Sequence, residues 1–573
     1  MYDARETLVA MFCARVRGQA HRTALHLPAG EGKFRTLSWH DLAHDVRRTA
    51  LVLKRLGVRP GDRVVQVSEN RYEWIVVDLA IHLARGVHVA VHAALSGPQI
   101  SYQIIDSGAR VVIVSGGEQL TKLASPEMGL PDSLPWIAFD PIEPQHEPAP
   151  GGRPVPMLVK LLDELANDQA SAEQAELLES DSLRETQPND LATILYTSGT
   201  TGEPKGVMLS HRNLASNAMA TLAAFDYSPD DLRLSWLPFS HIFSRTCDLY
   251  TWIASGSQLA LAESRDKILA NCQSLRPTML NGVPYFFDKV RRFVIGEQKA
   301  GEPGWLAALF GGRMRLCCSG GAALPNETAE FFWQRGVTLL QGYGLTESSP
   351  VITISTATAH KLGTVGRPIS GVEVGIADDG EILTRGPHVM LGYWNRPDDT
   401  ADAIRDGWLL TGDLGQLDCD GYLRITGRKK ELIVTAGGKN IAPVFLENLL
   451  VEDPLIVQAM VIGDGRNYLT ALIVPNPEAL GTAISERQIP VHSVAEALVH
   501  PDVVALYRQQ IDARLRDVAS CERIQRFTLL SRGFTLELGE LTPTLKLRRA
   551  VVQQHFADEI HGLYLEQDPD NPV

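Results

Sequence analysis

Short apolar runs alternate with helix-like segments along much of this chain, and this alternation decides its fold class. From about residue 36 to 115 the apolar runs include VVQVSE (Val64 to Glu69) and RVVIVSGG (Arg110 to Gly117). The alternation resumes at ATILYTSGTTG, residues 192–202, and continues to about residue 350. Such a pattern is typical of strands layered with helices. Because 573 residues are too many for one hydrophobic core, we expect two α/β layered subdomains, one from each stretch.

The pattern changes after residue 360, where short alternating apolar segments are separated by turn residues. Asp378-Asp379-Gly380 and Asp420-Gly421 each lie between two such segments, as β-hairpins require. We therefore predict a β-rich subdomain. From about Lys429 another mixed region follows and ends near His561, before a polar, acidic tail. We expect this region to be a separate, small C-terminal α+β domain.

Two connecting segments have compositions of their own. Eight prolines lie between Pro131 and Pro156, too many for a helix or an interior strand, which predicts a surface loop. Residues 157–186 are rich in Glu, Asp, Ala and Leu and read as a polar helical connector. The first 17 residues predict an amphipathic helix. They do not resemble a secretory signal, because their apolar run is short and is preceded by acidic residues instead of a basic leader.

Charge and cysteine content narrow the partners and the compartment. With 54 basic and 68 acidic side chains the net charge is −14, so broad binding to nucleic acid is not expected. Seven cysteines without a C-x-x-C pair argue against a disulfide framework or a zinc ribbon and favour a reducing compartment, hence the cytoplasm. Adjacent Cys317 and Cys318 are expected to be buried in a strand. No apolar stretch approaches the ~18 to 20 residues that span a bilayer, which leaves peripheral membrane contact open.

Histidines do not suggest a metal site. His82, His88 and His92 lie close together in the sequence, but HVAVH alternates like a strand and brings no cysteine or carboxylate ligand with it. We expect core or edge histidines there.

The strongest local signal is TSGTTGEPKG, Thr197 to Gly206, directly after the apolar run Thr193 to Tyr196. Its glycines and hydroxyls can turn several donors toward one anion, and Lys205 adds a positive charge. It is not a Walker loop, because no Ser or Thr follows Gly206 to hold magnesium. On composition alone, a hydroxyl-rich surface loop without a ligand remains an equal alternative.

Tyr196 to Val207 resembles the phosphate-loop motif of the adenylate-forming superfamily, which includes acyl-CoA synthetases. Further segments resemble that family's motifs in the family's order: Gly320-Gly321-Ala322, QGYGLTES (Gln341 to Ser348), WLLTGDLG (Trp408 to Gly415), GRKKELI (Gly427 to Ile433) and GELTPTLKLRR (Gly539 to Arg549). The resemblance covers nearly the whole chain. It implies a large N-terminal domain, residues 1–427, with the ATP and acyl sites, and a mobile C-terminal domain, residues 428–573.

The resemblance also implies roles for individual residues. Tyr343 stacks on adenine, Thr346 contacts the α-phosphate, Glu347 holds Mg²⁺, Asp413 accepts the ribose hydroxyls, and Arg428 reaches the same sugar. The other nucleotide-binding residues implied are Thr197, Ser198, Gly199, Thr200, Thr201, Gly202, Lys205, Gly320, Gly321, Ala322, Gln341, Gly342, Gly344 and Ile425.

These roles suit the chemistry, because an anionic carboxylate must approach an anionic phosphate and both charges need neutralising. Taken singly, each residue has an ordinary alternative, such as a core tyrosine for Tyr343 or a turn aspartate for Asp413.

For the C-terminal domain the resemblance implies a catalytic lysine, Lys546, which bridges the carboxylate and the α-phosphate, and a hinge at Lys430. TAGGKNIAP, Thr435 to Pro443, resembles a loop that faces the active site during thioester formation, which places Gly437, Gly438 and Lys439 on the CoA side. We therefore expect ATP and coenzyme A as co-substrates. A fatty acyl-AMP ligase that loads a carrier protein is the alternative; such ligases carry an inserted N-terminal segment that is not evident here.

LPFSHIFSR, Leu237 to Arg245, resembles long-chain fatty acyl-CoA synthetases and favours a long-chain fatty acid, with His241 at the acyl site. A structural histidine is an equal reading of His241. Some long-chain enzymes have a gating tryptophan where this chain has Arg245, which puts that gate in doubt. An inactive relative that only binds nucleotide or acyl chains is the third hypothesis. It is disfavoured because competent charged residues occupy every expected position, namely Lys205, Glu347, Asp413, Arg428 and Lys546.

Overall fold

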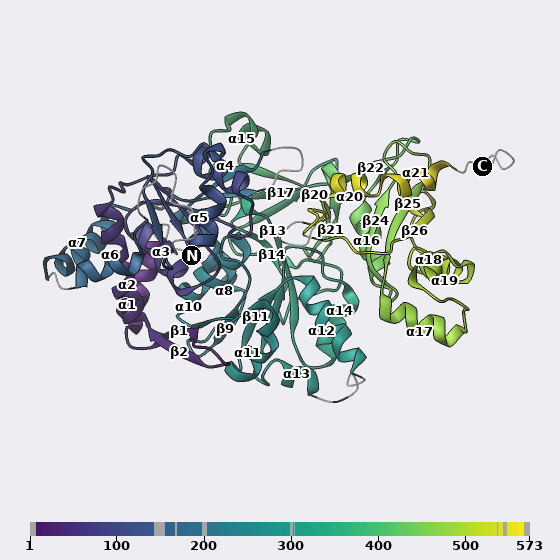
Figure 1. Cartoon of the computed structure of the whole chain (residues 1–573), viewed down its shortest axis with the longest axis horizontal. Helices are drawn as coiled ribbons and strands as arrows, with labels where there is room; N and C mark the ends of the chain where they lie inside the picture. Colours follow the sequence, from purple (N-terminus) through teal and green to yellow (C-terminus); the bar gives the residue numbers. More distant parts are fainter. Residues whose placement is uncertain are drawn as a thin grey trace.

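The computed structural model places most of the chain in a large N-terminal part and the remainder in a smaller C-terminal part at one end (Figure 1). It describes residues 7–142, 155–166, 169–197, 203–297, 302, 304–535, 537–541 and 547–565. The predicted fold class, a mixed α/β multidomain chain, is confirmed.

The first sheet has seven strands and is mainly parallel. Its order is β18 (Gly392–Tyr393), β8 (Lys205–Ser210), β7 (Leu191–Thr197), β4 (Val87–Val91), β3 (Arg63–Val67), β5 (Val111–Val114) and β6 (Trp136–Ala138). β4 lies at its centre and is buried throughout, as the apolar HVAV run predicts. His88 is accordingly a core histidine, as expected.

The second sheet has nine strands. Its order is β15 (Arg367–Pro368), β14 (Val351–Ile354), β13 (Leu339–Gly344), β12 (Leu316–Ser319), β11 (Met279–Gly282), β9 (Leu232–Ser235), β10 (Gln258–Leu261), β1 (Thr23–Pro28) and β2 (Phe34–Ser38). Cys317 and Cys318 lie buried in β12, as predicted.

The two α/β subdomains are present, but their division along the chain is not the predicted one. The stretch beginning at residue 192 was expected to start the second subdomain, whereas β7 and β8 complete the first sheet. Conversely, β1 and β2 join the second sheet through β10. Pairing between strands so far apart in sequence depends on tertiary packing, which local periodicity does not report.

Helices cover both sheets, and the main core lies where they meet. Trp39, the first residue of α2 (Trp39–Arg55), stacks on Trp252 of α10 with ring centroids 4.5 Å apart, and both are fully buried. This joins an early helix to the segment that follows β9. The remaining N-terminal helices are α1 (Leu8–Gln19), α3 (Tyr72–Leu83), α4 (Gly97–Ser107), α5 (Gly117–Leu123), α6 (Leu158–Ala166), α7 (Gln169–Glu185), α8 (His211–Ala223), α9 (Ile242–Ser244), α10 (Thr251–Ser255), α11 (Ile268–Leu275), α12 (Pro284–Gly296), α13 (Trp305–Leu309), α14 (Asn326–Gln334) and α15 (Pro397–Ala403).

The predicted helices at the N-terminus and at residues 157–186 are confirmed as α1 and as α6 with α7. The predicted surface loop between Pro131 and Pro156 is wrong in one place. Trp136–Ala138 forms β6, which pairs with β5 at the edge of the first sheet. Prolines on both sides of a three-residue edge strand do not block it, since its outer backbone groups have no neighbouring strand to bond.

The β-rich subdomain is confirmed as a five-stranded sheet of β16 (Glu373–Ile376), β17 (Glu381–Arg385), β19 (Ile404–Arg405), β20 (Trp408–Leu417) and β21 (Leu423–Arg428). Both predicted hairpins form. The turn at Asp378 to Gly380 joins β16 to β17, and the turn at Asp420-Gly421 joins β20 to β21.

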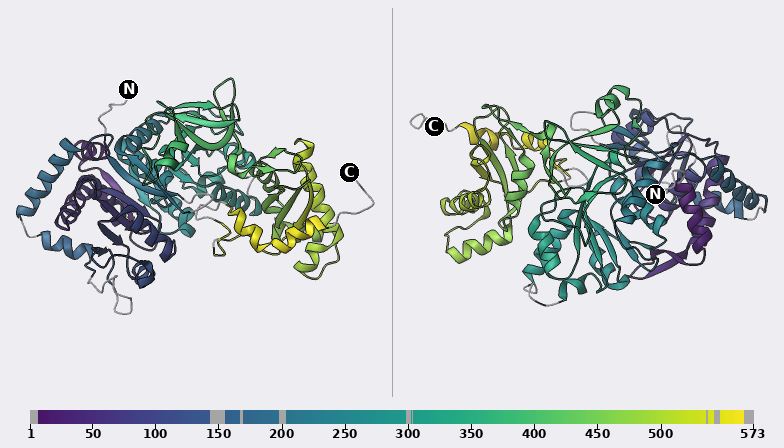
Figure 2. Two further views of the ribbon diagram at one scale, coloured as in Figure 1. Left: turned by 90° about the horizontal axis from the view of Figure 1, so that it is seen from above. Right: turned by 180° about the vertical axis from the view of Figure 1, so that it is seen from behind.

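The C-terminal part packs around a three-stranded sheet of its own. It forms one end of the molecule, on the right in the left view of Figure 2 and on the left in the right view. Its buried apolar clusters contain no residue before Ile433 among the described residues. Its elements are β22 (Ile433–Val434), β23 (Asn440–Ile441), α16 (Pro443–Val451), β24 (Ile456–Ile462), β25 (Leu469–Pro475), α17 (Pro477–Arg487), α18 (Val494–Val499), α19 (Pro501–Arg514), β26 (Ile524–Leu529), α20 (Arg549–His555) and α21 (Ala557–Leu565). In the described ranges, no helix combines the length and apolar character needed to cross a membrane.

Candidate active site

The predicted phosphate side lies at the β7–β8 hairpin. Thr197 pairs with Lys205 across the two strands, while Ser198, Gly199, Thr200, Thr201 and Gly202 lie outside the described residues. Lys205 Nζ forms an ion pair with Asp399 of α15 and lies 5.2 Å from the ring centroid of Tyr393. The ammonium group therefore already has a carboxylate partner in this structure.

Tyr393 connects Glu347 to the group formed by Lys205 and Asp399. The Tyr393 hydroxyl donates to Glu347 Oε1 over 2.9 Å. Burial and the neighbouring Glu347 raise the pKa of Tyr393, so its phenol keeps the proton that it donates. Thr346 and Glu347 form a short helical turn directly after β13, and both are half-buried.

The residues present fit a magnesium ion that also binds phosphate. Glu347 is a half-buried carboxylate, and within the described residues its second oxygen, Oε2, accepts no hydrogen bond. Hard cations such as Mg²⁺ prefer carboxylate and phosphate oxygens. No group of three or more metal-ligating side chains occurs in the parts of the chain that the structure describes.

The predicted sugar side is organised around Asp413 of β20. Its Oδ2 accepts a hydrogen bond of 2.7 Å from the Tyr343 hydroxyl, and its Oδ1 accepts one of 2.8 Å from Arg428 Nε. β20 and β21 pair Asp413 directly with Arg428. Each carboxylate oxygen has two lone pairs, so both can accept a further bond from a ligand hydroxyl.

Tyr343 and Ile425 share one apolar cluster with buried Val365, Ile382 and Leu423 of the β-rich subdomain. Burial and Asp413 raise the pKa of Tyr343 well above its ordinary value, so it remains a neutral donor to that carboxylate. Three residues separate Tyr343 from Glu347, so the predicted sugar and phosphate sides meet at the end of β13 and the turn that follows it.

The glycines of the predicted adenine segments lie at the ends of neighbouring parallel strands. Gly320 follows β12, and Gln341, Gly342 and Gly344 belong to β13. The carboxyl ends of such strands are where open α/β sheets bind ligands. Gly344 has no room for a side chain, because an added Cβ would lie 1.7 Å from the carbonyl oxygen of Pro350. Gly321 and Ala322 are exposed next to Gly320.

An apolar cluster, here called the α8–β14 cluster, lies next to Gly320 and Gly342. Phe243 packs against it and also lies against Gly320, where an added Cβ would be 2.9 Å from the ring. Gly342 would meet Ile354 of the cluster at 3.4 Å. The buried members are Ala220, Cys247, Val351, Ile354 and Ile369.

His241 immediately precedes α9, and its Nδ1 accepts the backbone N–H of Phe243 over 3.3 Å. The side chain is half-buried. It lies two residues before Phe243, which packs against the apolar cluster. Arg245, in contrast, is fully buried away from this site and forms an ion pair with Asp78.

The predicted hinge and CoA-side residues are surface positions next to β21. Lys430 is exposed, whereas its neighbour Lys429 pairs with Asp379 at 2.6 Å and Glu381 at 2.9 Å. Gly437, Gly438 and Lys439 form the exposed turn between β22 and β23, in which Gly438 has a φ of +71°. Lys546 lies outside the described residues.

Sequence reasoning missed Tyr393, Asp399 and Lys429. Asp399 lies 194 residues beyond Lys205, and no local pattern distinguishes it from any helix-starting aspartate. The only available signal was the aromatic GYW run before α15, Gly392 to Trp394.

Comparison with family models covers most of the chain. Residues 12–394 match the family model described as AMP-binding enzyme, and residues 430–568 match that of the AMP-binding enzyme C-terminal domain. The chain belongs to the AMP-binding enzyme family. This confirms the predicted membership of the adenylate-forming superfamily.

The similarity to curated relatives and to solved structures covers nearly the full length of this chain. The chain is 36% identical to proteins named long-chain-fatty-acid–CoA ligase FadD15 from Mycobacterium bovis and Mycobacterium tuberculosis, with 93% of this chain and 93% of each relative covered. ATP-bound MatB from Rhodopseudomonas palustris has a TM-score of 0.71 at 25% identity, covering 97% of this chain and 99% of that one. The anthranilate CoA ligase AuaEII in complex with anthranoyl-AMP has a TM-score of 0.74 at 20% identity, covering 97% and 98%, and shares the fold.

Proposed function

We propose that this family member is an AMP-forming acid–CoA ligase that activates a long-chain fatty acid. The observation that carries the proposal is the continuous arrangement of three groups at the end of β13: a phosphate side around Lys205 and Glu347, a sugar side around Asp413, and the apolar α8–β14 cluster behind Gly320 and Gly342. Relatives named long-chain-fatty-acid–CoA ligase over 93% of the chain support the acyl class.

On the phosphate side, Lys205 exchanges Asp399 for the phosphates of ATP, with Thr197 and residues 198–202 completing the loop. Glu347 and the ATP phosphates would hold Mg²⁺, which supplies charge neutralisation at the phosphoryl group. Tyr393 orients Glu347 by its hydrogen bond. Thr346, in the same turn, would contact the α-phosphate.

On the sugar side, Asp413 accepts the ribose hydroxyls while Tyr343 and Arg428 hold its carboxylate in place. The aromatic face of Tyr343 is the stacking surface for adenine, and Ile425 packs within the same cluster. Gly320 to Ala322 and Gln341 to Gly344 lie alongside as backbone neighbours of the nucleotide.

In the first step a carboxylate oxygen of the acid attacks the α-phosphorus and pyrophosphate leaves, giving acyl-AMP. In the second step the CoA sulfur attacks the acyl carbon and AMP leaves with the bridging oxygen. The acyl chain would lie against the α8–β14 cluster, with His241 beside the carboxyl group.

Two parts of the proposal concern the C-terminal domain, residues 428–573. It turns about Lys430 between the two steps, so that Lys546 serves adenylation and the turn Gly437 to Lys439 serves CoA. CoA as the acceptor is favoured over a carrier protein by the relatives named CoA ligases. We also propose a cytoplasmic location, because free cysteines suit a reducing compartment.

Oxygen transfer tests this function directly. With a fatty acid labelled by ¹⁸O in both carboxyl oxygens, the two steps place one label in AMP and leave one in the thioester. The experiment is mass spectrometry of AMP after a single turnover with Mg·ATP and CoA. Unlabelled AMP would contradict an acyl-adenylate, and a labelled AMP that forms only with short acids would contradict the proposed acyl class.

A further inference from the structure

The segment that follows His241 is one continuous helical run with an unusual centre. α9 (Ile242–Ser244) passes into a π-helix, Arg245–Tyr250, and this continues as α10 (Thr251–Ser255). π-helical segments are rare and occur frequently at functional sites. This one carries Cys247, whose side chain belongs to the α8–β14 cluster.

On one side the π-helix is anchored to the first sheet by Arg245. The guanidinium donates to Asp78 of α3, to Thr193 Oγ1 of β7 over 2.8 Å and to the Tyr250 hydroxyl over 2.8 Å. Arg245 and Asp78 are both fully buried. The arginine at the expected gate position is therefore an anchor within the core.

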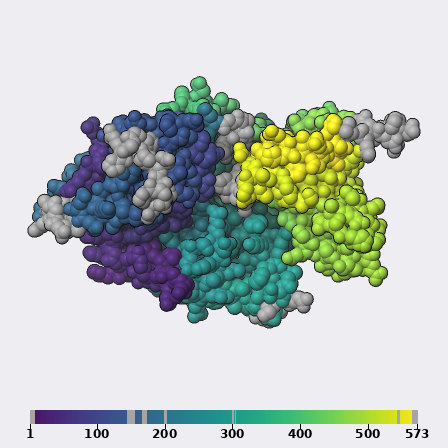
Figure 3. Space-filling model, viewed as in Figure 1, coloured from purple at the N-terminus to yellow at the C-terminus, as the bar shows by residue number. Residues whose placement is uncertain are grey.

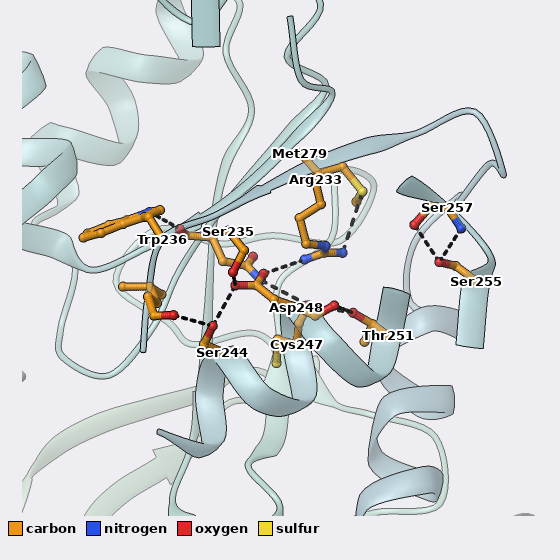
Figure 4. Close-up of polar contacts among 12 residues, drawn as sticks. Arg233, Ser235, Trp236, Ser244, Cys247, Asp248, Thr251, Ser255, Ser257 and Met279 are labelled. Carbon is orange, nitrogen blue, oxygen red and sulfur yellow. Dashed lines mark hydrogen bonds and ion pairs between the residues drawn. The ribbon is translucent and has the colours of Figure 1, made fainter. Parts of the chain in front are cut away.

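On the other side the π-helix is anchored to the second sheet by Asp248, as Figure 4 shows. Asp248 is 1% exposed. Its Oδ1 accepts from Asn281 Nδ2 of β11 at 2.7 Å and from Arg233 of β9 at 3.2 Å, and its Oδ2 accepts from the Ser235 hydroxyl at 2.9 Å. The Arg233 guanidinium is held in turn by the Tyr227 hydroxyl at 3.0 Å.

Asp248 also reaches the acyl segment itself. The Ser244 hydroxyl lies 2.9 Å from Asp248 Oδ2 and 2.9 Å from the carbonyl oxygen of Leu237, the first residue of LPFSHIFSR. Asn281 Nδ2 additionally bonds the carbonyl of Cys247 over 3.2 Å. One buried carboxylate thus connects β9, β11, the acyl segment and the residue that faces the apolar cluster.

We propose that Asp248 is a positioning residue for the acyl group: by clamping the π-helix to the second sheet it fixes where Cys247 and Phe243 stand beside the α8–β14 cluster, and thereby which acyl chains are accepted. This rests on the proposed function. Asp248 contacts no substrate. Removing the negative charge of Asp248 leaves the buried Arg233 guanidinium without its ion-pair partner, which is costly, so the π-helix is expected to shift.

The test compares Asp248→Asn with the wild type over straight-chain acids from four to twenty carbons. The expected result is an altered chain-length preference and a KM for palmitate raised about tenfold, a change of roughly 1.4 kcal/mol, because the displaced π-helix moves Cys247 and Phe243 relative to the apolar cluster. The KM for ATP stays within about twofold, because the sugar and phosphate sides lie on other elements. Ser244→Ala, which keeps the charge, is expected to shift the preference in the same direction by a smaller factor.

Ser255→Ala is the matched control. Ser255, the last residue of α10, bonds Ser257 over 2.8 Å and the carbonyl of Trp252, and none of these partners belongs to the acyl segment (Figure 4), so the chain-length profile of this variant should equal that of the wild type. A merely structural role of Asp248 would reduce the amount of active enzyme, lowering kcat for every acid at unchanged KM. That result would overturn the proposal.

Equilibrium binding of palmitate, measured by calorimetry on the same proteins, separates the two hypotheses. A wild type that binds palmitate but releases no pyrophosphate would refute the ligase function, while weaker binding by Asp248→Asn would still support the positioning role. Equal palmitate affinity in wild type and variant would overturn the positioning role whatever the activity.

Discussion

Replacing Asp413 with asparagine isolates the sugar side of the site. The asparagine keeps the size of the side chain and one acceptor oxygen, which can still face Arg428 Nε, now 2.8 Å from Asp413 Oδ1. Its amide nitrogen replaces Oδ2, so the Tyr343 hydroxyl must change from donor to acceptor. What is lost is the negative charge offered to the two ribose hydroxyls.

The expected cost follows from the two bonds. Hydrogen bonds to charged groups contribute about 1.5 to 3 kcal/mol and neutral ones about 0.5 to 1.5 kcal/mol, so two weakened bonds cost about 2 to 3 kcal/mol. Since 1.4 kcal/mol is tenfold, the KM for ATP should rise about 30- to 150-fold. The KM for the fatty acid should stay within about twofold.

The assay is initial-rate pyrophosphate release at varied ATP, repeated with 2′-deoxy-ATP and 3′-deoxy-ATP. The wild type should discriminate against both analogues, and Asp413→Asn should discriminate less, because the partner of the missing hydroxyl is already impaired. Asp418→Asn is the control: it lies at the turn of the same hairpin and pairs with Lys361 at 2.6 Å, so it should leave the KM for ATP unchanged. Equal discrimination by wild type and Asp413→Asn would refute the ribose assignment.

Four further outcomes are expected. Lys205→Ala should lower the rate of adenylation about 100- to 1,000-fold, the usual effect of removing a donor to a developing anion, as measured by single-turnover pyrophosphate release. Lys546→Ala should suppress adenylation while sparing thioester formation from supplied acyl-AMP. Glu327→Gln removes the ion pair of 2.9 Å with Arg514 and should change the rates of the two half-reactions in opposite directions. Glu540→Gln should destabilise the C-terminal domain at pH 7 but not at pH 2, as read from urea unfolding.

The Glu327 prediction rests on where the ion pair lies. Arg514, from α19, contacts Glu327 of α14, so the pair joins the smaller C-terminal part to the large one, whose surfaces meet in Figure 3. Breaking this ion pair should disfavour the present arrangement of the two domains relative to the rotated arrangement proposed for the other half-reaction. Arg508→Ala is the control, because its pair with Asp512 at 2.9 Å lies within α19. Equal effects on both half-reactions would contradict the reasoning.

The Glu540 prediction follows from its ion pairs. The hydrogen bond from Arg532, followed by burial that acts against it and a hydrogen bond from His555, sets the pKa of Glu540 at about 2, below its ordinary 4.5. A pKa lowered by folding means that the stabilisation is complete above about pH 4.5 and is lost as the pH falls toward 2. A stability difference between wild type and Glu540→Gln that persists unchanged at pH 2 would refute it.

For the remaining two variants the controls are close neighbours. Asp399→Asn frees Lys205 from its ion pair and should not weaken ATP binding, whereas a loss equal to that of Lys205→Ala would mean that the pair is structural. Arg548→Ala, two residues after Lys546, should affect both half-reactions little. Equal loss of both half-reactions in Lys546→Ala would contradict its assignment to adenylation.

Much of the candidate site could be proposed from the sequence because its residues occur in contiguous motifs. Tyr343 at the end of β13 and Glu347 in the next turn are four positions apart, and the β20–β21 hairpin pairs Asp413 with Arg428 directly, so local sequence contains both arrangements. Both hairpins of the β-rich subdomain were predictable for the same reason: their turn residues are local.

What could not be predicted depends on contacts distant in sequence. Asp399 and Tyr393 complete the phosphate side from a segment nearly 200 residues beyond Lys205, and nothing in their local pattern marks that role. The distribution of strands between the two sheets, with β1 in the second and β7 in the first, likewise depends on which edges pack together. Arg245 shows the same limit, because its burial against Asp78 depends on α3, which lies 167 residues earlier.

The account is tested most directly by the product formed from Mg·ATP, CoA and a mixed panel of short, long and aromatic acids. Mass spectrometry, with and without CoA, identifies the product. The account predicts a long-chain acyl-CoA in the presence of CoA and enzyme-bound acyl-AMP in its absence. The absence of any ATP-dependent acyl product, or acyl-AMP that never proceeds to a thioester, would contradict it.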